Sequence, residues 1–215
     1  MDNKEIKNLI DEIKVIRDMV LKDKEVVDKF ILSRGIRYLS LVFGGIVLIM
    51  FWGIYELVRL GYDTSVFSRY FIVGVLVLIS IVAGVVKFLS WRSIDPSFSL
   101  TSFVSKVLGV GYIKVFFVLV GIMVFLSLYL VMVGLYGYLL VVIGVGVGIL
   151  YLLYGVMFHN FELEFLSYYI ILTSLLSLFF VSKDSYDVYL WVGIVFGVGF
   201  ILFFLITTIR VMRER

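Results

Sequence analysis

The chain has 215 residues, of which 62% are hydrophobic and 16% are charged, against about 45–50% and about 25% in soluble domains. This composition excludes an ordinary water-soluble domain, and the absence of cysteine excludes disulfides and thiolate metal sites. The formal net charge of +3 is small, so the placement of the charges is more informative than their sum.

Residues 1–35 are rich in charge and predict a cytoplasmic amphipathic helix ahead of a membrane domain, residues 36–215. Apolar side chains recur at alternating spacings of three and four, as in a coiled-coil seam, with Asp23 as the one break. We expect this helix to bind a partner protein or a second copy of the chain. The seam consists of Ile6, Leu9, Ile13, Ile16, Val20, Val27 and Phe30.

Two alternatives for this helix stay open. It packs on the loops of its own chain, or it lies flat on the membrane surface. The second alternative is less favoured, because surface helices are usually rich in basic residues. Residues 1–30 carry seven basic and eight acidic side chains, which gives little attraction to anionic lipid.

The remainder of the chain predicts an all-α polytopic membrane protein. A helix needs about 20 largely apolar residues to cross the bilayer core, and continuous apolar runs favour helices over the alternating strands of a barrel. Six transmembrane helices are expected, at about 38–58, 70–90, 113–134, 137–158, 165–182 and 187–209.

Between the second and third spans, the loop 91–112 predicts a short helix in the membrane interface. Asp95 suits its N-cap, Pro96 its first turn and Gly109 its end. The six spans are expected to form three hairpins, because tyrosines recur 17 residues apart around the first, third and fifth spans. Interfacial tyrosines in any membrane protein also explain that spacing. The pairs are Tyr38 and Tyr55, Tyr112 and Tyr129, and Tyr169 and Tyr186.

Basic residues near the span ends predict that both termini are cytoplasmic, in an integral protein of the cell membrane. With that orientation the outer side holds only Arg59, Arg69 and Lys183. The inner side holds Arg34, Arg37, Lys87, Arg92, Lys106, Lys114, Arg210, Arg213 and Arg215.

Glycines four residues apart predict close helix packing, because small residues let two backbones approach in lipid. These are Gly144 and Gly148 in the fourth span, and Gly193 and Gly197 in the sixth. A hinge or a ligand groove is the alternative. No span contains proline, so a helix broken at mid-membrane would depend on glycine, and the fourth span is the best candidate. Hydroxyl groups inside the spans are expected to bond to their own helices.

No catalytic or cofactor site is predicted. The single histidine, His159, lies near Glu162 and Glu164 in a short loop, but the spacing matches no metal motif and indicates a solvated turn. Zinc-protease chemistry needs a second histidine. No aspartate lies in the interior of a span, and nucleic acid is disfavoured by the slightly acidic N-terminal segment.

The expected function is therefore a non-enzymatic integral membrane adaptor or regulatory subunit, embedded in the lipid bilayer, whose N-terminal helix recruits a partner or a second copy. The alternative is a subunit for binding or transport of a small solute, working with partner proteins. Neither expectation involves a cofactor or a metal.

Overall fold

The computed structural model describes residues 28–61, 109–181 and 187–213, together with five residues between 81 and 92. Over these residues the chain is helical apart from short turns. Four of the described helices are long and apolar enough to cross a bilayer. Over the part that the structure describes, the protein is therefore a helical membrane protein.

The four long helices are α2 (Arg34–Arg59), α6 (Leu139–Phe158), α7 (Phe161–Phe180) and the helix Asp187–Arg213. This last helix is made of α8 (Asp187–Val192), the π-helical segment η3 (Gly193–Val198) and α9 (Gly199–Arg213). A further apolar helix, α5 (Gly109–Val133), is joined to α6 through the short 3₁₀ turn η2 (Tyr136–Tyr138).

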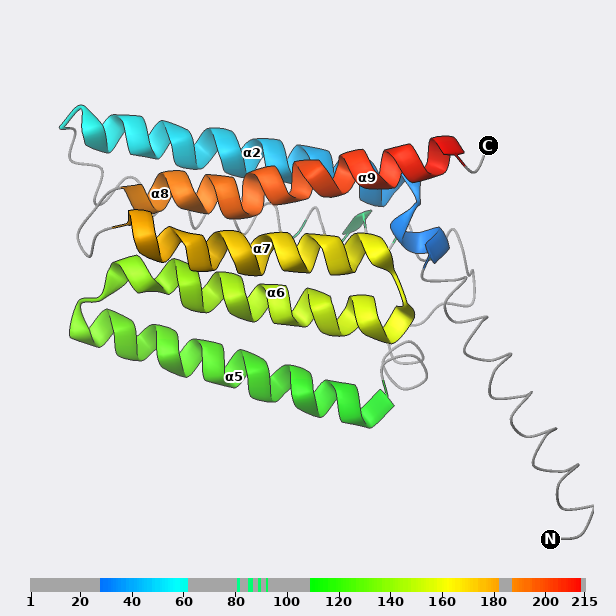
Figure 1. The fold of residues 1–215 in the computed structure, drawn as a ribbon, viewed down its shortest axis with the longest axis horizontal. Coiled ribbons are helices and arrows are strands. Elements are labelled where there is room, and N and C mark those ends of the chain that lie inside the picture. The colour runs from blue at the N-terminus through cyan, green and yellow to red at the C-terminus, as the bar shows by residue number, and fades with distance from the viewer. Residues whose placement is uncertain are drawn as a thin grey trace, which may run out of the picture.

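The helices lie side by side, in the order α5, α6, α7, α8–α9 and α2 (Figure 1). The most extensive interface joins α6 and α7. At one end of this bundle α2, α5 and α7 begin while α6 and α9 end. We call it the proximal end. Because α2 packs on the helix Asp187–Arg213, the first and last long helices of the described residues are neighbours.

The helix bounds follow the predicted spans closely in the described residues. The predicted range 137–158 corresponds to Leu139–Phe158, whereas α7 begins four residues before the predicted residue 165 because Asn160 caps it. The second span and the interfacial helix fall almost wholly outside the described residues, so the six-span and three-hairpin arrangements stay predictions. The fourth span was the wrong candidate for a break, since α6 is continuous and the irregular segment is η3.

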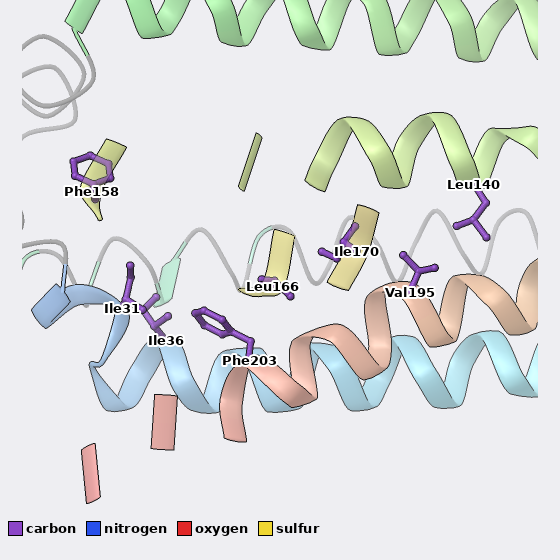
Figure 2. Packing of buried hydrophobic residues seen from close by; sticks show 8 residues of the cluster. All are labelled: Ile31, Ile36, Leu140, Phe158, Leu166, Ile170, Val195 and Phe203. Atoms are coloured by element: carbon purple, nitrogen blue, oxygen red, sulfur yellow. The ribbon is translucent and has the colours of Figure 1, made fainter. Parts of the chain in front are cut away.

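Two apolar clusters hold the helices together. On α2, Val47, Met50, Phe51 and Ile54 share one face and pack against the helix Asp187–Arg213. The larger cluster brings together side chains from α2, α6, α7 and the last helix, with Ile31 ahead of α2 (Figure 2). Its buried members are Ile31, Ile36, Leu140, Phe158, Leu166, Ile170, Val195 and Phe203.

The outer faces of the bundle carry large exposed apolar side chains. Phe117 and Phe125 of α5 are about as exposed as Phe179 of α7 and Ile49 of α2. In water such a surface would promote aggregation, whereas a bilayer solvates it. The exposed surface thus agrees with the membrane assignment.

Candidate functional site

The corner between α6 and α7 is built by two residues with unusual roles. His159 ends α6 in the left-handed conformation (φ 49°), which turns the chain sharply. Asn160 follows as the N-cap of α7, and its side-chain oxygen accepts a hydrogen bond from the backbone N–H of Leu163 (3.0 Å). The cap uses only the oxygen of the Asn160 amide, so the nitrogen is available to a third element.

That third element is the chain just ahead of α2. The Nδ2 group of Asn160, which is fully buried, donates to Oδ1 of Asp28 (2.8 Å). The other carboxylate oxygen of Asp28 accepts from Nη2 of Arg210 in α9 (3.3 Å). Asp28 therefore joins the base of the N-terminal segment to the α6–α7 corner and to the end of the last helix.

Arg210 also forms a two-oxygen ion pair with Glu162 in the first turn of α7. Its Nη1 lies 2.9 Å from both Oε1 and Oε2 of Glu162, whose residue is only 2% exposed. Charge-assisted bonds to a carboxylate are among the strongest in proteins, and a buried carboxylate without such a partner is very unfavourable. We call this set, Asp28, Asn160, Glu162 and Arg210, the Asp28 cluster.

The Asp28 cluster corrects the predicted solvated turn. His159 is exposed as expected, but Asn160 and Glu162 are buried because Arg210 and Asp28 replace water around them. Across the described ranges no group of three metal-binding side chains occurs. The cluster pairs carboxylates with a guanidinium and an amide. It therefore holds separate segments of the chain together.

The predicted packing glycines lie at two different interfaces. Gly144 and Gly148 of α6 face α7, where an added Cβ would meet the side chains of Ser174 and Ile171 respectively. Gly193 and Gly197 of η3 face α2, and a Cβ on Gly197 would lie 2.9 Å from the backbone nitrogen of Leu48. At both interfaces the missing side chain allows the neighbouring helix to approach.

The π-helical segment η3 is held from the side by Tyr169 of α7. Its hydroxyl donates to the carbonyl oxygen of Ile194 (3.0 Å), and its ring lies against Gly199. A π-turn interrupts the regular helical hydrogen bonds and often occurs at functional sites. Tyr169 supplies a partner to a carbonyl group in that interrupted region.

Removal of the Tyr169 hydroxyl is expected to destabilise the bundle. The variant Tyr169→Phe leaves the Ile194 carbonyl without this donor, and we expect a loss of about 1–2 kcal/mol in the free energy of unfolding. The measurement is unfolding by SDS titration in mixed micelles. The neighbouring Tyr168→Phe is the matched control, since Tyr168 is exposed. Equal losses in the two variants would contradict the role of the Ile194 contact.

The hydroxyl groups of the spans behave in two ways. Thr173 and Ser177 bond to carbonyl oxygens of their own helix, as predicted. Ser174 does not: its Oγ is buried and, within the residues the structure describes, has no hydrogen-bond partner. It lies beside Gly144, close to Val195 of η3.

Most of the predicted coiled-coil seam lies outside the described residues. Of its members only Phe30 is described, and it packs against the larger apolar cluster of the bundle. Asp28 and Ile31 on either side also contact the bundle. The seam residues Ile6, Leu9, Ile13, Ile16, Val20 and Val27 stay a prediction.

No sequence motif identifies the Asp28 cluster. Its members are ordinary charged or amide residues that are far apart in the chain, and the only sequence signal is their position at span ends. Comparison of the chain with protein-family models, with curated proteins and with solved structures gave no match.

Proposed function

We propose that the protein is a non-enzymatic integral membrane adaptor or regulatory subunit. Its membrane domain, with six spans and both termini in the cytoplasm, serves as the anchor. The N-terminal helix serves as the recruiting element, and its heptad seam binds a cytoplasmic partner or a second copy of the chain. The excess of basic residues on the inner side supports this orientation.

The observation that carries the proposal is the attachment of Asp28. A fixed base suits an adaptor, because a long flexible linker lowers the effective concentration of the recruiting segment at its target. Asp28 bonds to the α6–α7 corner and to α9 at once, and Ile31 is buried in the bundle core. The chain that directly follows the segment 1–27 is therefore fixed to the bundle.

Acidic residues in the seam are expected to abolish assembly. The double variant Ile13→Asp, Val20→Asp places two charges in the a positions, where they would be desolvated in a coiled coil. We expect at least a hundredfold weaker association, because two buried charges each oppose it by about 2 kcal/mol or more. The mass of the detergent-solubilised protein, and the partner that co-purifies from native membranes at fixed stoichiometry, are the measurements.

The control for the seam variant carries the same added charge away from the seam. In the double variant Asn8→Asp, Val15→Asp both substitutions occupy c positions of the heptad, so assembly should be retained. Membrane insertion should be unchanged in both variants. If the seam variant assembles as the original chain does, the adaptor proposal is wrong.

A second candidate is the small-solute binding or transport subunit that works with partner proteins. It is favoured by one observation: the buried hydroxyl of Ser174, which has no hydrogen-bond partner among the described residues, lies near the irregular segment η3. The seam variant distinguishes the two candidate functions. A solute subunit would keep saturable binding of its solute to the full chain when the seam is charged, whereas an adaptor would lose its defining interaction.

A further inference from the structure

Arg37 is a buried arginine that has no acidic partner among the residues the structure describes. The residue is 9% exposed and lies in the first turn of α2, at the proximal end. Its Nε donates to the carbonyl oxygen of Leu32 (3.1 Å) and its Nη1 to the hydroxyl of Thr208 (3.4 Å). Both acceptors are neutral, so neither compensates the charge.

Two of the three acids described at this end of the bundle are engaged elsewhere, and Glu164 of α7 is in none of the ion pairs of the described residues. Asp28 and Glu162 both pair with Arg210, and none of the ion pairs found among the described residues includes Arg37. The Nη2 group of Arg37 forms no hydrogen bond to a described residue. Among the described residues, Ser174 Oγ is the only side-chain N or O atom that is fully shielded from solvent and has no hydrogen-bond partner, so Nη2 does not belong to that class. Nη2 is therefore not completely sealed, although Arg37 as a whole is only 9% exposed.

The charges at the start of α2 also oppose its helix dipole. A helix N-terminus is electropositive and favours acidic residues, as in α7, whose first turn holds Glu162 and Glu164. The first turn of α2 has no acidic residue and holds Arg34 and Arg37, one turn apart. Two arginines thus belong to the electropositive first turn of α2.

We propose that Arg37 and Arg34 bind a phosphate group, supplied by the headgroup of an anionic phospholipid. A guanidinium matches phosphate oxygens with two parallel hydrogen bonds, and the electropositive helix end adds to the attraction. Arg37 immediately precedes the predicted first span, so it lies at the depth of the lipid headgroups. The site is independent of the adaptor proposal, because it uses no residue of the seam.

Lipid titration of the full-length protein in neutral detergent tests the site. Phosphatidylglycerol, phosphatidylcholine and inorganic phosphate are added separately, and bound lipid is counted by native mass spectrometry while the melting temperature is followed by tryptophan fluorescence. We expect phosphatidylglycerol to bind and to raise the melting temperature. Arg37→Gln should weaken this binding roughly tenfold or more, since charge-assisted hydrogen bonds are lost.

Arg59→Gln is the matched control, because Arg59 is an exposed arginine at the opposite end of α2. It should bind phosphatidylglycerol as the original chain does. If Arg37→Gln fails to fold, Arg34→Gln replaces it, since Arg34 is exposed and its loss should weaken binding without unfolding the bundle. If inorganic phosphate alone raises the melting temperature, the phosphate site is supported and its ligand is a soluble phosphate. Equal binding of the two lipids, or unchanged affinity in the Arg34 and Arg37 variants, would overturn the proposal.

Discussion

Arg210→Ala is expected to destabilise the protein by about 3 kcal/mol, because it leaves the buried carboxylate of Glu162 without its positive partner. Glu162 is 2% exposed and both of its oxygens lie 2.9 Å from Nη1 of Arg210. The same substitution removes one of the two bonds of Asp28. The measurement is the free energy of unfolding by SDS titration in mixed micelles.

Two further variants separate charge compensation from general damage to α9. Arg213→Ala removes an exposed arginine one turn later and should change the free energy of unfolding by less than about 0.5 kcal/mol. Glu162→Gln, combined with Arg210→Ala, removes the uncompensated charge and should recover a large part of the loss. A double variant as unstable as Arg210→Ala would show that the ion pair is not the cause.

Gly44→Ala is expected to force apart the first and last helices. A Cβ at this position would lie 2.6 Å from the carbonyl oxygen of Gly197 and 3.0 Å from the backbone nitrogen of Ile201. Both are backbone atoms, so a change of side-chain rotamer cannot relieve these contacts. Overpacking of this kind costs about 1–3 kcal/mol, and we expect the same assay to show a loss of about 2 kcal/mol.

Gly45→Ala is the control next to it in the chain. A Cβ on Gly45 would meet nothing within 4 Å, and alanine is the better helix former by up to about 1 kcal/mol. The Gly45 variant should therefore be as stable as the original chain or slightly more stable. Equal losses at the two positions would mean that α2 does not approach the last helix as closely as the structure shows.

The helices themselves could be predicted well because lipid makes the rule simple. A long apolar run can satisfy its backbone in a bilayer only as a helix, so α6 and the helix Asp187–Arg213 were located from composition alone. The irregular segment could not be placed, because glycines occur in both the fourth and the sixth span. Which of them deviates depends on the neighbour: in η3, Gly197 lies against Leu48 of α2, and Tyr169 bonds to the Ile194 carbonyl.

The Asp28 cluster could not be predicted because sequence carries no direct signal for which span ends meet. A glutamate in a short loop is normally solvated, and Glu162 becomes a buried residue only because Arg210 reaches it from α9. Phe30 illustrates the same limit. Its spacing assigns it to a coiled-coil seam, while the structure places it against the bundle core.

The bond between Asp28 and Arg210 also sets an order of events during biosynthesis. The two residues are 182 positions apart, and ribosomes add roughly 5–20 residues per second. Roughly 10–40 s therefore pass between the synthesis of Asp28 and the synthesis of Arg210. Throughout that interval the nascent N-terminal segment lacks this attachment, and only translation of the last helix completes it.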